Sequence, residues 1–171
     1  EVSDFIAEID FVQSASKVAL ENGYCCPVIS NGEGLSEGSR EGPWSGEETQ
    51  DSFCQAEEIR HALIEAILHD VPYIPNDVDL GKKTNGLLLF GLNASGKSSY
   101  MKSVGINIIM AQAGLWVAAK TFTYYPFKYL FTRILSNDNI FAGLSTFAVE
   151  MTEFKTILKY ANHQSIILGD E

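Results

Sequence analysis

The chain has 171 residues, of which 46% are hydrophobic, so it is long enough to form one domain with a sizeable core. Its formal net charge of −10 is unevenly distributed: residues 1–80 carry three Lys or Arg and seventeen Asp or Glu, whereas residues 81–171 carry nine and five. The acidic first half is therefore a poor candidate for contact with a nucleic-acid backbone, and anion-binding chemistry is expected in the second half.

The cysteine content and the hydrophobic runs indicate the class of protein. Cys25, Cys26 and Cys54 form an odd, sparse set, which is typical of a reducing compartment and not of a secreted disulfide framework. No run approaches the ~20 apolar residues that a membrane-spanning helix needs, and the first residues lack the basic start of a signal peptide. We therefore expect an intracellular protein of the cytoplasm, nucleus or an organelle matrix, without membrane contact. The chain starts without Met and stops at an acidic pair, so we expect a fragment of a longer protein.

In the first half, apolar residues recur at helical spacing over residues 2–22, which predicts an amphipathic helix that ends at Gly23. Residues 31–50 are rich in Gly, Ser and Glu and have almost no aliphatic side chain, so they predict a flexible surface insertion. Residues 57–69 are predicted to be a short strand or helix. The two prolines of residues 71–77 favour extended chain after it.

The second half alternates apolar strands and helices. Residues 86–90 (GLLLF) predict a buried strand, residues 91–96 a turn, and residues 97–117 a helix with apolar side chains three and four apart. A further helix is predicted over residues 147–161, and a buried strand over residues 165–168 (SIIL). Strands that are apolar on both faces and separated by helices predict an α/β layered domain with a largely parallel sheet.

A phosphate-binding motif occupies the turn between the predicted strand and helix. Residues 91–98 (GLNASGKS) fit the pattern G-x-x-x-x-G-K-[ST], in the structural context that this motif requires. The glycines let successive backbone N–H groups and the positive end of the helix face an anion. Lys97 would reach the β- and γ-phosphates of ATP, and the Ser98 hydroxyl would bind Mg²⁺. The alternative is a Gly-rich turn with a chance lysine.

An acidic pair follows the last predicted strand. Asp170 and Glu171 come directly after an apolar run, and a buried strand delivers such carboxylates at its C-terminal end, beside the phosphates. Asp170 would hold the Mg²⁺ shell, and Glu171 would polarise the attacking water as the catalytic base. The alternative is an acidic pair that only marks the end of a strand at the surface.

The segments around the motif identify a family. They are residues 90–101 (FGLNASGKSSYM), 131–134 (FTRI), 138–139 (DN), 143–147 (GLSTF) and 149–151 (VEM), with Arg60-His61 and residues 73–76 (YIPN) upstream. Together they resemble the MutS family of DNA mismatch-repair ATPases, over nearly the whole chain except residues 31–50. The resemblance implies an ABC-type P-loop NTPase fold. Residues 1–22 would end a connector helix, and residues 23–171 would form the ATPase domain, truncated after its second acidic motif.

The resemblance also implies a set of site residues. Those that would surround the nucleotide phosphates are Gly91, Leu92, Asn93, Ala94, Ser95, Gly96, Lys97, Ser98 and Ser99. Tyr73 matches an aromatic residue that stacks on adenine, with a core-edge tyrosine as the alternative. Ser145 matches a serine that acts across a dimer interface on the neighbouring subunit's nucleotide, with a helix N-cap as the alternative.

Three departures from the family pattern indicate a divergent branch, such as the MutS relatives of large viruses or organelles. Leu92 replaces the usual proline, Ala94-Ser95 replaces a bulky residue plus glycine, and Gly169 stands where methionine is frequent. None of these changes removes a functional group that the predicted chemistry requires.

We therefore expect an ATP-binding and ATP-hydrolysing domain that couples nucleotide state to binding of mismatched double-stranded DNA. The DNA would be bound by domains outside this chain, in a homodimer or heterodimer. One alternative is another DNA-repair ATPase of the SMC or recombination type, although no long coiled coil or LSGG-type signature occurs. Others are a non-hydrolysing nucleotide-gated module and a P-loop kinase, but a kinase lid would be rich in arginine and only Arg133 follows Arg60.

Overall fold

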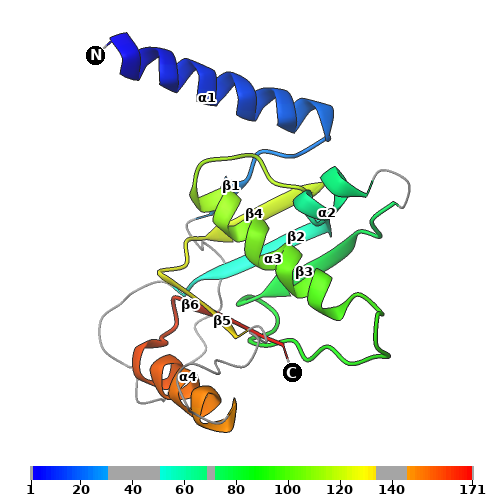
Figure 1. The fold of residues 1–171 in the computed structure, drawn as a ribbon, viewed down its shortest axis with the longest axis vertical. Coiled ribbons are helices and arrows are strands. Elements are labelled where there is room, and N and C mark those ends of the chain that lie inside the picture. The colour runs from blue at the N-terminus through cyan, green and yellow to red at the C-terminus, as the bar shows by residue number, and fades with distance from the viewer. Residues whose placement is uncertain (1, 31–50, 69–71, 134–145, 171) are drawn as a thin grey trace.

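The computed structural model describes residues 2–30, 51–68, 72–133 and 146–170 (Figure 1). In chain order its elements are α1 (Val2–Glu21), β1 (Val28–Ile29), β2 (Phe53–Ile59), α2 (Ala62–Ile67), β3 (Asn76–Leu80), α3 (Lys97–Gln112), β4 (Thr121–Tyr125), β5 (Tyr129–Arg133), α4 (Thr146–Tyr160) and β6 (Ser165–Gly169). The predicted insertion 31–50 lies outside the described residues. No helix among the described residues is long and apolar enough to cross a membrane.

The strands form two sheets. The larger one has the order β1-β4-β2-β3, in which β1 runs parallel to β4 while β2 runs antiparallel to both β4 and β3. The smaller one pairs β5 with β6 in parallel, with Arg133 opposite Gly169 at the end of the ladder. The α/β class is confirmed, but the predicted largely parallel sheet is not, because the four-stranded sheet is mixed. Of its two central strands, β4 was not recognised in the sequence and β2 only at its end, and the two run in opposite directions.

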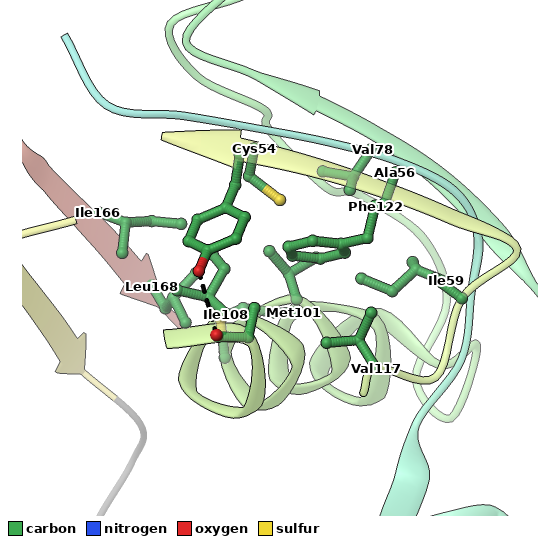
Figure 2. Close-up of a cluster of buried hydrophobic side chains, with 14 residues drawn as sticks. Cys54, Ala56, Ile59, Val78, Met101, Ile108, Val117, Phe122, Ile166 and Leu168 are labelled. Atoms are coloured by element: carbon green, nitrogen blue, oxygen red, sulfur yellow. Dashed lines mark hydrogen bonds between the residues drawn. The ribbon is translucent and has the colours of Figure 1, made fainter. Parts of the chain in front are cut away.

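Helix α3 lies across the four-stranded sheet and supplies one side of the hydrophobic core (Figures 1 and 2). The buried residues of this core are Cys54, Ala56, Ile59, Val78, Met101, Val104, Ile108, Ala111, Val117, Ala119, Phe122, Tyr124, Ile166 and Leu168. Phe122 is 2% exposed, and burial of such a side chain contributes about 1.5–3 kcal/mol. Because Ile166 and Leu168 of β6 join this core, α3 packs against both sheets.

The predicted helices are confirmed with small changes of boundary. Residues 97–117 form a helix only as far as Gln112, because Gly114 adopts a left-handed backbone conformation with φ 78°. Residues 57–69, predicted as strand or helix, contain the end of β2 and then α2. Strand β6 over Ser165–Gly169 is also confirmed.

The predicted strand over residues 86–90 is wrong. These residues belong to no strand, and Leu88 and Phe90 are 86% and 91% exposed. An apolar run predicts a strand only if a neighbouring strand accepts its backbone hydrogen bonds, and none of the described strands pairs with this segment. The run instead lines the cleft described below.

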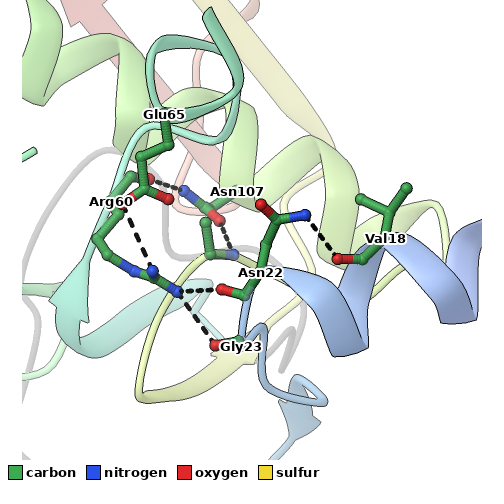
Figure 3. Close-up of polar contacts among 7 residues, drawn as sticks. Val18, Asn22, Gly23, Arg60, Glu65 and Asn107 are labelled. Atoms are coloured by element: carbon green, nitrogen blue, oxygen red, sulfur yellow. Dashed lines mark hydrogen bonds and ion pairs between the residues drawn. The ribbon is translucent and has the colours of Figure 1, made fainter. Parts of the chain in front are cut away.

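Helix α1 projects from the rest of the molecule, at the end opposite α4 (Figure 1). The predicted helix is confirmed, but its apolar side chains do not pack on the domain, because Phe5, Ile6 and Ile9 are exposed and Ala19 is its one buried residue. The helix is held at its C-terminal end. There the Arg60 guanidinium donates hydrogen bonds of 3.2 and 3.1 Å to the carbonyl oxygens of Asn22 and Gly23 (Figure 3).

A buried amide connects this junction to α3. The side-chain nitrogen of Asn107, which is fully buried, donates to the carbonyl oxygens of Arg60 (2.9 Å) and Ser103 (2.8 Å), and its side-chain oxygen accepts a 2.7 Å bond from the Ala118 N–H. Because each polar atom of this amide has a partner, its burial leaves no hydrogen-bonding group unsatisfied. Residue 60 is thus joined both to the end of α1 and to the middle of α3 (Figure 3).

Candidate functional site

Residues 91–96 form a turn that leads directly into α3. Gly96 is the N-cap of the helix with φ 91°, and the Tyr100 N–H donates the first helical hydrogen bond to its carbonyl oxygen at 2.9 Å. Ala94 also has a positive φ, 61°, which costs a residue with a Cβ roughly 1–2 kcal/mol. Backbone strain of this kind is concentrated at ligand-binding positions, so the turn has the character of a functional loop.

Lys97 closes this turn. Its ammonium group donates hydrogen bonds of 2.9 Å to the carbonyl oxygens of Gly91 and of Leu92, so the side chain folds back over the loop that precedes it. Gly91 has little space for a side chain, since a Cβ there would lie 3.0 Å from Ser95 Oγ. The positive charge is therefore held where the backbone of the loop surrounds it.

The start of α3 carries no negative charge. Its first turn contains no acidic residue, and Ser98 and Ser99 are half-buried there. The unpaired N–H groups and the helix dipole give this end a partial positive charge, which Lys97 reinforces. Loop residues 92–96 are exposed, so an anion can approach from solvent.

Asp170 follows β6 and lies at the same cleft as Lys97. The cleft has a volume of about 1300 Å³, and Gly91, Lys97 and Asp170 are all among its lining residues. The Asp170 N–H donates a 2.8 Å hydrogen bond to the Arg133 carbonyl oxygen, which extends the β5–β6 ladder by one step. The structure thus brings together the lysine and the first carboxylate that the sequence predicted to act together.

The walls of the cleft are mainly apolar. The apolar lining residues include residues 87–90, Met101 and Val104 of α3, and Ile157 and Leu158 of α4. Apolar walls with a few charged groups are typical of small-molecule sites, although the cleft is larger than the roughly 300–1,000 Å³ usual for them. It has room for a nucleotide together with further protein or solvent.

Two predicted site residues lie outside the described part of the chain. They are Glu171, the predicted catalytic base, and Ser145, the predicted trans-acting residue. Their roles stay predictions.

Tyr73 lies beside the cleft, close to Tyr100, which is one of the lining residues. Its ring centroid is 6.4 Å from that of His61 at an interplanar angle of 52°, and it is not among the cleft-lining residues. Burial raises the pKa of its hydroxyl, against a smaller effect of a hydrogen bond with Ser103 on α3. This is the environment of the core-edge tyrosine that the sequence left open as an alternative. Stacking on adenine stays a prediction.

Arg133 does not line the cleft but pairs with the strand end that leads to Asp170, and sequence reasoning assigned it no role. It ends β5 beside Asp170, and its Nε lies 3.8 Å from Glu153 Oε2 on α4. Its guanidinium carbon lies 4.9 Å from the centroid of the Phe154 ring. The sequence does contain a signal for this residue. Arg133 ends the run of residues 129–133 (YLFTR), just as Asp170 follows the run of residues 165–169 (SIILG).

Comparisons with known proteins identify the family of this chain. Residues 87–171 match the family model for MutS domain V. The chain is 38% identical over 206 residues to a DNA mismatch repair protein mutS homolog of Acanthamoeba polyphaga mimivirus, which covers 100% of the chain and 17% of that protein. It is 38% identical over 166 residues to DNA mismatch repair protein MutS of Synechococcus sp., covering 97% of the chain and 16% of that protein.

A mitochondrial relative is also similar. The mitochondrial DNA mismatch repair protein mutS homolog of Sarcophyton glaucum is 44% identical over 119 residues, covering 70% of the chain and 12% of that protein. The chain thus spans between 12% and 17% of the length of these three curated relatives.

Proposed function

Because this chain belongs to the MutS family of DNA mismatch-repair proteins, whose members are ATPases, we propose that it binds and hydrolyses ATP at the cleft between the loop 91–98 and Asp170. The observation that carries the proposal is the common cleft of Lys97 and Asp170. A cation in a loop before a helix and a carboxylate after a parallel strand are the two halves of a P-loop nucleotide site. Residues 23–171 would then be the ATPase domain, and residues 1–22 its connector helix.

The loop supplies the phosphate contacts. Residues 91–99 present backbone N–H groups and the positive end of α3, and the Lys97 ammonium would exchange the carbonyl oxygens of Gly91 and Leu92 for phosphate oxygens. An ammonium–phosphate contact is charge-assisted and stronger than a bond to a neutral carbonyl. The exchange therefore favours the bound state.

Two oxygen donors suit Mg²⁺. The Ser98 hydroxyl in the first turn of α3 and the Asp170 carboxylate after β6 are hard ligands of the type that this ion prefers. When bound, Mg²⁺ neutralises charge on the phosphates that Lys97 also contacts. Glu171, next along the chain, would orient and deprotonate the attacking water.

Further contacts complete the proposal. Tyr73 would stack on adenine, and Ser145 would act on the nucleotide of a neighbouring subunit, which requires a homodimer or heterodimer. Mismatched double-stranded DNA would be bound by domains outside this chain, in line with the mismatch-repair names of the relatives. Nucleotide state would then control DNA binding.

The test is Mg²⁺-dependent ATP hydrolysis by the full-length protein, with and without a mismatched duplex. We expect Lys97→Ala to lower kcat/KM by about 10²–10³, the loss typical for one preorganised charge-stabilising donor. Glu171→Gln should bind nucleotide but stall before hydrolysis. Lys102→Ala is the matched control, because Lys102 is an exposed lysine on the same helix and does not line the cleft.

The outcomes separate the alternatives. Hydrolysis that responds to the duplex and is lost in Lys97→Ala, but not in Lys102→Ala, supports the proposal. Nucleotide binding without hydrolysis or DNA response would instead identify a nucleotide-gated module. Equal activity of Lys97→Ala and the unsubstituted protein would place the chemistry elsewhere.

A further inference from the structure

We propose that Arg133 is a positioning residue, which holds helix α4 against the end of the strand pair that carries Asp170 and thereby sets the shape of the nucleotide cleft. This inference rests on the proposed function, since it concerns the same cleft. It assigns a role to a side chain that lies outside the loop 91–98 and the acidic pair.

The backbone of Arg133 holds Asp170. In the β5–β6 ladder Arg133 pairs with Gly169, and its carbonyl oxygen accepts the Asp170 N–H at 2.8 Å. Strand β6 ends at Gly169, so this hydrogen bond continues the ladder by one residue, to Asp170. A displacement of residue 133 therefore displaces the backbone of the carboxylate.

The side chain of Arg133 holds α4. Its Nε lies 3.8 Å from the Glu153 carboxylate, and its guanidinium lies over the ring of Phe154, 4.9 Å from the centroid. The Arg133 side chain is 15% exposed, whereas Glu153 is 47% and Phe154 is 41% exposed, so the guanidinium is shielded from water while its two partners on α4 are partly open to solvent. One residue thus contacts both the acidic strand end and the helix.

Few of the described side chains of α4 are buried. Of its described side chains, residues 151–160, only Ile157 is buried, while Phe154 and Leu158 are 41% and 75% exposed. Yet Ile157 and Leu158 line the cleft, so the position of α4 determines where one wall stands. A helix with so little buried surface needs a specific contact to hold it at a fixed distance from Asp170.

An arginine suits this role better than a lysine. The planar guanidinium can face an aromatic ring and a carboxylate at the same time, whereas an ammonium group is a compact, strongly hydrated charge. We therefore expect Arg133→Lys to retain part of the ATPase activity. Arg133→Met keeps the length of the side chain but removes its positive charge and its planar group, so it should lose most of the activity.

The test is the steady-state kinetics of the full-length protein with Mg²⁺-ATP, measured well below the melting temperature of each variant. Arg133→Met should lower kcat by about tenfold or more, because small misplacements of a reacting group cost up to ~10² in rate. It should also raise the Mg²⁺ concentration at half-maximal activity, while KM for ATP changes by less than about threefold because the loop 91–98 is intact. Arg133→Lys should lie between Arg133→Met and the unsubstituted protein.

The controls separate positioning from general stability. Lys155→Met makes the same change of charge at an exposed position of α4. It should leave kcat, KM for ATP and the Mg²⁺ concentration at half-maximal activity unchanged. Glu153→Gln and Phe154→Leu test the contact from the α4 side if Arg133→Met does not fold, and each should give a smaller loss of the same kind.

Three results are informative. Reduced kcat with a shifted Mg²⁺ dependence in the Arg133 and Glu153 variants supports the inference. A lower melting temperature with unchanged kcat and Mg²⁺ dependence overturns it, because Arg133 would then only stabilise the fold. Absence of hydrolysis in the unsubstituted protein would overturn the proposed function and this inference together.

Discussion

Gly105 of α3 lies directly against the side chain of Leu168 in β6: a Cβ at residue 105 would be 2.6 Å from Leu168 Cδ1. Leu168 is only 7% exposed, so it has little room to move aside. This contact joins the helix that begins at Lys97 to the strand that ends before Asp170. The close approach of the two elements is what brings the loop and the carboxylate to one cleft.

Gly105→Ala should therefore destabilise the protein, although alanine favours helix. The clash costs about 1–3 kcal/mol, against a gain of roughly 0.5–1 kcal/mol in helix propensity, so we expect a net loss of about 1 kcal/mol. Denaturant unfolding measures this difference. In a Leu168→Ala background the same substitution should become neutral or stabilising, and a loss of equal size in both backgrounds would contradict the contact.

The pKa of His61 predicts how stability depends on pH. Burial chiefly lowers the pKa of its imidazole below the ordinary value of 6.5, against a smaller opposing effect of a backbone hydrogen bond, and the positive charge of Lys102 lowers the pKa slightly further. Its Nδ1 accepts the Ile64 N–H at 3.2 Å as the N-cap of α2, which requires the neutral ring. Below pH 6.5 the unfolded chain binds the proton more readily than the folded one, so stability is lost as the pH falls.

The measurement is the free energy of unfolding between about pH 8 and about pH 5, the range in which histidine titrates. His61→Asn keeps a side chain that can cap α2 without titrating, so its stability should fall less over this range. His61→Ala should be less stable than His61→Asn at pH 8 because it lacks the cap. A pH dependence of the Asn variant as steep as that of the unsubstituted protein would show that other groups cause it.

Arg60 is predicted to hold the end of α1. Removing the guanidinium in Arg60→Ala leaves the carbonyl oxygens of Asn22 and Gly23 without their charged partner, and because both bonds are exposed to solvent each is worth about 0.5–1.5 kcal/mol. Hydrogen exchange at residues 19–24 should become faster, measured by mass spectrometry of the folded protein. Lys17→Ala removes an exposed cation of the same helix, whose ion pair with Glu21 spans 3.9 Å, and should change little. Equal exchange in the two variants would contradict the role of Arg60.

The cysteines should differ in reactivity. Cys54 is fully buried, and burial, with a smaller effect of the Asp79 charge, raises the pKa of its thiol to about 12, whereas Cys26 is exposed. Since the thiolate is the reacting form, iodoacetamide should label Cys26 and leave Cys54 unmodified in the native protein. Mass spectrometry of peptides checks this, with denatured protein as the control in which both react. Labelling of native Cys54 at the rate of Cys26 would show that the core around β2 opens readily.

Local patterns in the sequence were sufficient to predict the three long helices and the loop of residues 91–96. The spacing of apolar side chains predicted α1, α3 and α4, because a helix forms its hydrogen bonds within its own segment. The phosphate-loop motif likewise needs only eight consecutive residues, and its turn and helix are confirmed. The family was recognised from short segments for the same reason.

Sheet pairing was decided by tertiary contacts. Strands β1, β4 and β5 were not predicted, and β2 was predicted only at its end, since each depends on partners far along the chain. The apolar run of residues 86–90 is no strand because no described strand pairs with it. The orientation of a strand relative to its neighbours is likewise not encoded in its own residues. The sheet therefore differs from the largely parallel one that buried apolar runs predicted.

The sequence by itself determined which groups the site contains: a lysine after a glycine-rich turn, a serine beside it, and acidic residues after an apolar strand. Only the tertiary structure decided that Lys97 and Asp170 line one cleft while Tyr73 does not line it, and that Arg133 spans the strand end and α4. The physical reason is the distance along the chain between the residues that interact. Local spacing sets backbone conformation, whereas the packing of α3 on β6 through Gly105 and Leu168 joins residues more than sixty positions apart, and no local pattern encodes that contact.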